Sequence, residues 1–313
     1  MALLVVGSVA YDSVETPFGK VDQALGGSAT YFSLSASFFT PVRLVACVGK
    51  DFKQEHRALL ESRNVDLGGL QVLEGDTFRW SGAYGYDLND ARTLDTQLNV
   101  FSDFNPELPE DFRQSEYLFL GNIDPDLQRN VLAQVRAPKV VACDTMNYWI
   151  DGQFKSLLET LKGVDLLVIN DAETRQLAQE SNLVKAARKI MTWGPKTIVV
   201  KRGEYGVVKF GLNSKNELDV FGAPAYPLED VFDPTGAGDT FAGGMMGYLA
   251  GTDRYDDQAI RQAIIFGSVM ASFNVEKFSV DRLSELTFTE VELRYREFKQ
   301  ITHFDDVVEL ERF

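Results

Sequence analysis

The sequence predicts an α/β fold in which a doubly wound, mostly parallel central sheet is flanked by helices, together with a small β-sheet appendage. Two observations carry this prediction. Short apolar runs alternate with amphipathic segments of helical length along the chain. The runs are apolar at almost every position, as strands are when helices cover both faces of their sheet. With 45% apolar residues among 313, the chain can build such a core.

The elements follow one another in the order that this fold requires. The predicted strands of the central sheet are residues 3–9, 42–48, 117–121, 140–144, 165–170 and 197–201. The predicted helices are residues 32–39, 51–63 with Asp51 as N-cap, 125–135, 152–161, 172–179, 183–192, 241–249 and a segment from about residue 256. Ligands of such sheets bind at the carboxyl ends of the strands, so the site is expected there.

Two regions depart from the alternation. Residues 13–24 and 69–100 are extended, contain no helical segment, and the second is rich in aromatic residues. They are predicted to form the β appendage over one edge of the sheet; an ordinary edge hairpin is the alternative, because aromatic residues simply favour strands. The sequence shows no internal repeat or linker, so residues 1–313 are taken as one domain.

Composition excludes several classes of function. A net charge of −15 argues against a nucleic-acid partner, although it does not argue against ATP, which backbone amides and a metal hold locally. Cys47 and Cys143 lie in apolar runs and are predicted to be buried free thiols. No basic leader and no run of membrane-spanning length occurs, so the protein is expected to be cytoplasmic, without a membrane partner.

Residues 233–244, DPTGAGDTFAGG, are the most informative stretch. They follow an extended segment, 220–232, and open a helix. Gly236, Ala237 and Gly238 are small enough for backbone N–H groups to surround an anion, at the positive end of that helix. Asp239 repels phosphate, but it suits the removal of a proton from an attacking hydroxyl. The string therefore indicates phosphoryl transfer to an alcohol, whereas the alternative is a glycine turn with Asp239 favoured by the helix dipole.

This string resembles the C-terminal signature of the ribokinase family, the PfkB carbohydrate kinases, which phosphorylate sugars and nucleosides with ATP. The resemblance implies a ribokinase-like fold, with Asp239 as catalytic base and Gly236, Ala237 and Gly238 as the anion hole. It also implies that the appendage, approximately residues 13–24 and 69–100, is a lid over the substrate. In some members the lid serves dimerisation, so the resemblance implies that two copies of this chain can pair through the lid as a homodimer.

Two motifs near the N-terminus point to the acceptor substrate. The first strand ends GSVAYD, residues 7–12, and the resemblance implies that Asp12 grips sugar hydroxyls; on sequence alone a turn aspartate is an equal alternative. Gly26 and Gly27 resemble the family's hinge between lid and main domain. Tyr31 stands where many members carry Asn, so the usual sugar contact at that point changes.

Further motifs point to ATP and its metal. Asn170 and Glu173 are spaced as a capping box, and the family's Asn-x-x-Glu motif implies that Glu173 organises Mg²⁺, through water. The resemblance assigns a nucleotide-binding role to Lys201, Gly203, Gly206 and Asn274; a tight turn and a polar helix end are the alternatives. A monovalent cation such as K⁺ is also typical of the family, but its carbonyl ligands leave no sequence signal. Asp144 and Asn147 follow a strand, with a spacing one residue longer than the family's Asp-x-Asn.

The sequence thus predicts an ATP- and Mg²⁺-dependent kinase that transfers the γ-phosphoryl group to a hydroxyl of a small-molecule sugar, polyol or nucleoside. A catalytically inactive binding or regulatory protein of the same fold is the alternative. A dinucleotide-dependent oxidoreductase is not favoured, because no Gly-x-Gly-x-x-Gly follows the first strand. Tyr31, Phe78, Trp80 and Tyr84 favour an acceptor with a flat face, a nucleoside or cyclic polyol, over free ribose.

Overall fold

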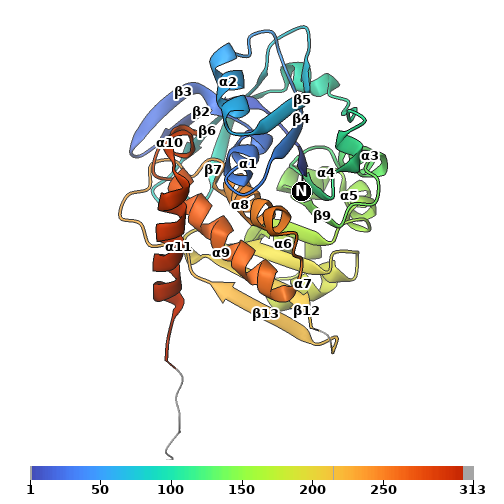
Figure 1. Cartoon of the computed structure of the whole chain (residues 1–313), viewed down its shortest axis with the longest axis vertical. Helices are drawn as coiled ribbons and strands as arrows, with labels where there is room; N and C mark the ends of the chain where they lie inside the picture. Colours follow the sequence, from blue (N-terminus) through green and yellow to red (C-terminus); the bar gives the residue numbers. More distant parts are fainter. Residues whose placement is uncertain (1, 214, 306–313) are drawn as a thin grey trace, which may run out of the picture.

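The computed structural model describes residues 2–213 and 215–305, and Figure 1 shows two sheets surrounded by helices. The larger sheet has the strand order β13-β12-β11-β10-β9-β8-β1-β4-β5. Neighbours from β11 through β5 pair in parallel, whereas β12 and β13 are antiparallel. Its strands are β1 (Leu3–Val6), β4 (Val42–Val48), β5 (Val65–Val72), β8 (Tyr117–Leu120), β9 (Val140–Cys143), β10 (Leu166–Asn170), β11 (Thr197–Lys201), β12 (Val207–Leu212) and β13 (Leu218–Ala223). The prediction of a mostly parallel sheet is confirmed.

Helices cover both faces of this sheet, which explains why its strands are apolar throughout. Along a strand, successive side chains point to opposite faces. Leu3 and Val5 belong to one core together with side chains of α1, α8 and α9, whereas Leu4 and Val6 belong to a second core with side chains of α3, α5 and α7. The helices are α1 (Ser28–Ala36), α2 (Gln54–Ser62), α3 (Pro125–Gln134), α4 (Asn147–Gly152), α5 (Phe154–Leu161), α6 (Asp171–Ala178), α7 (Leu183–Met191), α8 (Ala237–Thr252), α9 (Asp257–Asn274), α10 (Asp281–Glu285) and α11 (Phe288–Thr302).

The smaller sheet lies beside the N-terminal strands of the large one and has the order β3-β2-β6-β7 (Figure 1). Its strands are β2 (Ala10–Thr16), β3 (Gly19–Gly26), β6 (Phe78–Tyr84) and β7 (Ala91–Gln97). Fewer residues of the segment 69–100 belong to this sheet than the sequence suggested, because residues 69–72 complete β5 in the large sheet. Gly69 permits this close approach, since a Cβ there would lie 2.6 Å from Cγ2 of Val45.

The segment before α2 ties the small sheet to the large one. Asp51 does not cap α2, as the sequence suggested; its carboxylate accepts hydrogen bonds from the backbone N–H of Thr77 (2.7 Å) and its hydroxyl (2.6 Å). It also pairs with Arg79 of β6 at 3.0 Å. Because these contacts hold Asp51 against β6, the helix begins only at Gln54.

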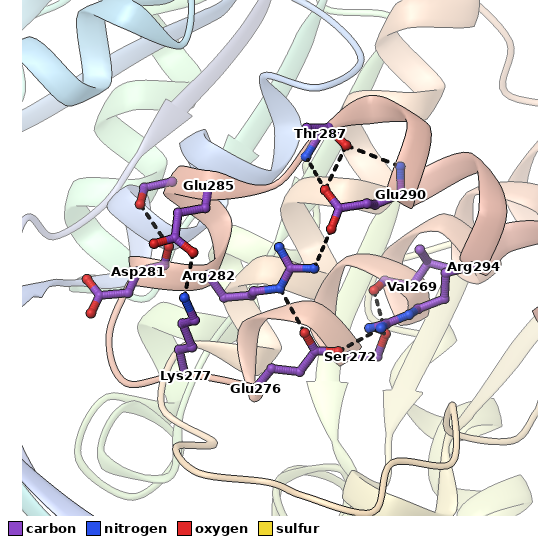
Figure 2. A network of polar contacts seen from close by, with 11 residues as sticks. Val269, Ser272, Glu276, Lys277, Asp281, Arg282, Glu285, Thr287, Glu290 and Arg294 are labelled. Atoms are coloured by element: carbon purple, nitrogen blue, oxygen red, sulfur yellow. Dashed lines mark hydrogen bonds and ion pairs between the residues drawn. The ribbon is translucent and has the colours of Figure 1, made fainter.

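A polar network fixes the C-terminal helices against one another (Figure 2). Arg282 of α10 pairs with Glu276 (2.8 Å) and with Glu290 of α11 (2.7 Å), and Arg294 of α11 pairs with Glu276 at 2.6 Å. The network closes the turn after α9, where the carbonyl of Val275 accepts a hydrogen bond from the N–H of Phe232 at 2.8 Å. It therefore supports the segment that leads directly into residues 233–239.

Two further expectations concern the whole chain. Cys47 and Cys143 are buried free thiols, as predicted. Of the helices formed by residues 2–213 and 215–305, none combines the length and the apolarity that crossing a membrane requires.

Candidate active site

Charged side chains from the ends of two strands and the first turns of two helices meet at the carboxyl edge of the large sheet. Asp144 follows β9, Glu173 lies in the first turn of α6 after β10, and Lys201 ends β11. Lys201 Nζ lies 3.5 Å from Asp144 Oδ2, and both side chains are largely buried. Asp239, in the first turn of α8, acts electrostatically on the same ammonium. This is the edge at which a doubly wound sheet binds its ligands.

The turn before α8 depends on glycine at two positions. Gly236 is the N-cap of α8 with φ +73°, a left-handed conformation that disfavours other residues, and a Cβ there would collide with the ring of Tyr31. A Cβ on Gly238 would lie 2.9 Å from Nζ of Lys201. The ammonium of Lys201 therefore lies against the N-terminus of α8, where the helix dipole already favours an anion.

The backbone of this turn presents donors, although not all those that the sequence suggested. The N–H of Ala237 donates to the carbonyl of Pro234 at 3.1 Å. Among the backbone hydrogen bonds of the described residues, none engages the N–H of Gly236 or of Gly238, whereas the N–H of Asp239 lies against its own carboxylate. The amides of Gly236 and Gly238 and the ammonium of Lys201 make a donor set that suits a phosphoryl group.

Asp239 is half-buried beside this donor set, and its ionisation is tuned by its neighbours. Its pKa is raised to about 7, mainly by loss of hydration and also by the carboxylate of Asp144, against the lowering effect of Lys201. A carboxyl group that titrates near neutrality suits a general base, because its deprotonated form is abundant and still basic. The geometry is therefore compatible with the base role that the signature implies.

Glu173 lies in the capping box that the sequence predicted. Asn170 Oδ1 accepts a hydrogen bond from the N–H of Glu173 (2.7 Å), and Glu173 Oε2 accepts one from the N–H of Asn170 (3.1 Å). The pKa of Glu173 is raised to about 7, mainly by burial and also by Asp144, against the lowering effects of Lys201 and of the hydrogen bonds with Asn170. The cap uses Oε2, so Oε1 keeps its acceptor capacity.

The carboxylates at this edge fit a hydrated Mg²⁺ rather than a protein cage. Among residues 2–213 and 215–305, no group of three His, Cys, Asp or Glu side chains is placed to hold a metal. Magnesium usually keeps several waters and binds one or two carboxylates together with substrate phosphates. Glu173 and Asp144 are close enough for their charges to interact, so they could accept hydrogen bonds from such waters.

Asp12 lies on β2 of the small sheet, within electrostatic reach of Asp239. It is 5% exposed, and its Oδ2 accepts a hydrogen bond from the N–H of Gly27 at 3.4 Å. A Cβ on Gly26 would collide with this carboxylate, and Gly27 has φ +93°, so both glycines are needed for the close approach. The pKa of Asp12 is raised to about 7, mainly by burial and also by Asp233 and Asp239, against the lowering effect of the hydrogen bond from Gly27.

Tyr31 contributes differently from what the sequence suggested. Its ring is 1% exposed and packs over Gly236, so it offers no free face to a substrate. Its hydroxyl is buried and has no hydrogen-bond partner within the described residues. Burial raises the pKa of this hydroxyl well above its usual value, and Asp12 and Asp233 raise it further. Tyr31 thus supports the turn before α8 through its ring, and its hydroxyl lies within electrostatic reach of Asp12 and Asp233.

Asn274 also has a supporting position. It is fully buried; its Nδ2 donates to the carbonyl of Thr235 at 2.8 Å, and its Oδ1 accepts from the hydroxyl of Thr240 at 3.1 Å. Because no surface of Asn274 is exposed and its amide is engaged on both sides, this geometry speaks against the expected contact with adenine. The residue instead braces the turn before α8.

The glycine loop after β11 lies next to the small sheet. Gly203 and Gly206 both have positive φ, +54° and +85°, as a tight turn requires. A Cβ on Gly203 would collide with Oδ1 of Asn89, which lies between β6 and β7. The β6–β7 connection therefore reaches from the acceptor side across to this loop.

The sequence singled out Tyr84 only as an aromatic residue of the small sheet, and it gave no role to Asp233. Tyr84 of β6 lies with its hydroxyl 3.2 Å from the hydroxyl of Thr235, which joins the small sheet to the turn before α8. Asp233 accepts hydrogen bonds from the N–H groups of Thr235 (2.9 Å) and Ser279 (3.0 Å). The Asp-Pro-Thr string signals the first of these bonds, an Asx turn, but nothing local signals the contact of Tyr84.

Comparison with known proteins agrees with this geometry. A model of the family described as pfkB family carbohydrate kinase matches residues 3–286. A cytidine kinase of Thermococcus kodakarensis is 29% identical over 258 residues, which cover 80% of this chain and 88% of that protein. The crystal structure of the Methanocaldococcus jannaschii nucleoside kinase superposes with a TM-score of 0.74 at 19% identity, covering 95% and 98% of the two chains. An E. coli protein described as a ribokinase II, in complex with ATP and Mg²⁺, has a TM-score of 0.75 at 17% identity, with 94% and 99% coverage.

Proposed function

The chain belongs to the pfkB family of carbohydrate kinases, and on that premise we propose that its acceptor is a nucleoside, phosphorylated with Asp239 as the base. Membership makes it a kinase of sugars or nucleosides that uses ATP. The observation that carries the proposal is the position of Asp239, beside unpaired backbone amides and in electrostatic reach of Asp12. Base, anion site and hydroxyl-binding carboxylate thus occupy one cleft.

The proposed reaction follows from these positions. Asp12 accepts hydrogen bonds from two hydroxyls of the acceptor sugar and orients it. Asp239 takes the proton of the attacking hydroxyl, whose oxygen forms a bond to the γ-phosphorus while the bond to the β-γ bridging oxygen breaks and ADP leaves. The amides of Gly236 and Gly238 and the ammonium of Lys201 stabilise charge on the transferred group. The Tyr84 contact with Thr235 helps the small sheet to exclude water, which would otherwise compete as acceptor.

ATP is proposed to lie along the carboxyl edge of the large sheet. Support comes from the donor set at α8, from the glycine loop of Gly203 and Gly206, and from the related E. coli structure that binds ATP and Mg²⁺. Glu173 is proposed to hold Mg²⁺ through water, and Mg²⁺ supplies charge neutralisation on the phosphates when bound. Asn170 orients Glu173 through the capping box.

A nucleoside is favoured over a free sugar or a cyclic polyol for two reasons. The curated relative of highest stated identity is a cytidine kinase, and the M. jannaschii neighbour is a nucleoside kinase. The small sheet also presents half-buried aromatic side chains, Trp80 and Tyr84, on the side of the cleft where Asp12 lies. Aromatic rings bind flat, apolar groups that a free pentose lacks.

The test is an ADP-release assay with ATP and Mg²⁺ against cytidine, inosine, adenosine, ribose, fructose and myo-inositol. We expect a kcat/KM for at least one nucleoside that exceeds those for ribose and myo-inositol, with the product carrying phosphate on the sugar. Preference for ribose or myo-inositol over every nucleoside would contradict the acceptor. The variant D239N distinguishes catalysis at this site from a contaminating kinase.

Location and assembly belong to the same proposal. The supply of ATP and the two free thiols favour a cytoplasmic protein.

A homodimer through the small sheet is supported by β7, an edge strand whose residues are all exposed, including Leu94 at 50%. Light scattering of the wild type and of L94E tests it: a dimer that L94E dissociates supports the proposal, and a monomeric wild type contradicts it.

A further inference from the structure

Trp80 lies on the cleft side of the small sheet. It is paired in register with Asp12, because β2 and β6 run parallel with Asp12 opposite Trp80. Side chains in register on neighbouring strands point to the same face of a sheet. Tyr84, four residues further along β6, points to that face as well and reaches Thr235 at the turn before α8. The indole of Trp80 therefore shares the face that carries Asp12 and Tyr84.

The indole is held in place by two contacts within the small sheet. A Cβ on Gly82 would collide with the outer atoms of the six-membered ring of Trp80, so the ring packs closely against this glycine. The indole N–H donates to the hydroxyl of Thr93 on β7 at 3.3 Å, which restricts the orientation of the ring. Trp80 is half-buried, so part of its indole stays exposed in this position.

The other aromatic residues near Asp12 are engaged in different ways. Tyr31 is buried against Gly236, and Phe78 stacks on Phe101 with ring centres 5.3 Å apart. Tyr84 is joined to the turn before α8 through its hydroxyl. Trp80 is thus the aromatic side chain of this group that is partly exposed, held in place within the small sheet and in register with Asp12.

Resting on the proposed nucleoside kinase function, we infer that Trp80 is the stacking platform for the nucleobase. The carboxylate of Asp12 leans toward Gly26 and Gly27, whereas the indole leans the opposite way, toward Gly82. The two groups therefore lie side by side along one face of the sheet, as the sugar and the base do in a nucleoside. Stacking needs only the π-face of the base, so Trp80 favours bases in general over acceptors without one.

Steady-state kinetics and tryptophan fluorescence of the full chain test this inference. The chain has three tryptophans, which makes W80F and the control W193F informative. Trp193 lies next to Lys189 at the end of α7, with the ammonium 5.9 Å from the ring centre, and belongs to no part of the proposed site. Cytidine and inosine should quench the fluorescence of W193F, and this quench should be largely lost in W80F. Myo-inositol, which has no base, should cause no such difference.

Removal of the ring should weaken nucleoside binding specifically. W80L should raise the KM for cytidine and inosine by about 5- to 100-fold, in line with the contribution of one stacked base. The KM for ATP should stay within about threefold, and W80F, which keeps an aromatic face, should retain most of the affinity. Unchanged KM and unchanged quench in W80F and W80L would overturn the inference, whereas failure of the wild type to phosphorylate any nucleoside would overturn the proposed function instead.

Discussion

At the scale of single residues, the site is a small group of charges that set one another's ionisation. Lys201 is one ammonium among three carboxylates, those of Asp144, Glu173 and Asp239. Burial by itself would lower the pKa of this lysine, but the three carboxylates raise it, so Lys201 stays charged. The same ammonium opposes the effect of burial on Asp239. The basicity of Asp239 therefore depends on neighbours that sequence distance does not reveal.

The pH profile should report this coupling. Asp239 acts when deprotonated, so kcat/KM should rise with pH through the pKa of Asp239 in the free enzyme, near 7. K201M removes a charge that lowers this pKa, and the acid limb should move to higher pH. D144N removes a charge that raises the pKa, and the limb should move to lower pH. The control is K196M, because Lys196 lies at the other end of β11, where it pairs with Asp165 at 3.0 Å. This variant should not change the pH at which the acid limb lies. Shifts of D144N and K201M in the same direction would contradict the coupling.

The sequence could suggest only those parts of the site whose residues lie close together in the chain. Asp239, Gly236 and Gly238 occur in one contiguous string, so the sequence predicts a joint role for them. Asp144 and Lys201 lie on strands that are not adjacent, and only the folded sheet brings them to 3.5 Å. Tyr31 could be noted as unusual, but its burial beneath Gly236 depends on packing between α1 and α8. Pairings that tertiary structure creates leave no periodic signal in the chain.

At the scale of secondary-structure elements, strands and helices with strong local signals were predicted well. β4 and β11 have the predicted bounds, and the capping box of Asn170 and Glu173 marks the start of α6. β12 follows the glycine loop, which the sequence predicted to join two strands, and it contains Lys209, a buried lysine inside an otherwise apolar strand. The charge of Lys209 is neutralised by Asp219 and Asp257, which come from β13 and α9. These two partners could not be predicted from local hydrophobicity, because the fold brings them to Lys209 from other elements.

The dual role of Glu173 can be separated by one substitution. E173Q keeps an oxygen that accepts from the N–H of Asn170, so the melting temperature should change little. Loss of the carboxylate charge should raise the Mg²⁺ concentration needed for half-maximal activity. E290Q is a matched control, since Glu290 forms the second capping box, with Thr287, away from the site. Magnesium curves of E173Q and wild type that coincide would leave Glu173 as a helix cap alone.

At the scale of the whole molecule, the small sheet contacts the large one at several points of the candidate site. Tyr84 contacts Thr235, Asn89 contacts the loop at Gly203, and the hydroxyl of Thr16 donates to the carbonyl of Phe232 at 2.9 Å. The small sheet thus reaches both the turn before α8 and the glycine loop after β11. The alternation of apolar runs predicted the large sheet, but the bounds of the small sheet were not predictable, because Gly69 continues β5 within an apparently uniform extended segment.

The proposed site has separate places for the two substrates. D12A removes the carboxylate that is proposed to bind the acceptor, and it leaves the residues proposed to bind ATP unchanged. Loss of a charged acceptor for hydroxyls costs roughly 1.5–3 kcal/mol, so the KM for the acceptor should rise about 10- to 150-fold. The KM for ATP should change little. D22A, which removes an exposed carboxylate of β3 that pairs with Lys20 at 3.1 Å, is the control. A rise confined to the KM for ATP would refute this division.

The central claim is that Asp239 is the base of a phosphoryl transfer. The most direct test is to measure the turnover of D239N with saturating acceptor and ATP, together with the affinity of this variant for ATP. The substitution keeps the size of the side chain and removes its basicity. We predict a fall in kcat on the order of a hundredfold or more. We expect the dissociation constant of ATP to stay within about threefold, because backbone amides and Lys201 form the phosphate site. Near-native turnover of D239N would contradict the account, since the proton would then leave by a route that does not involve Asp239.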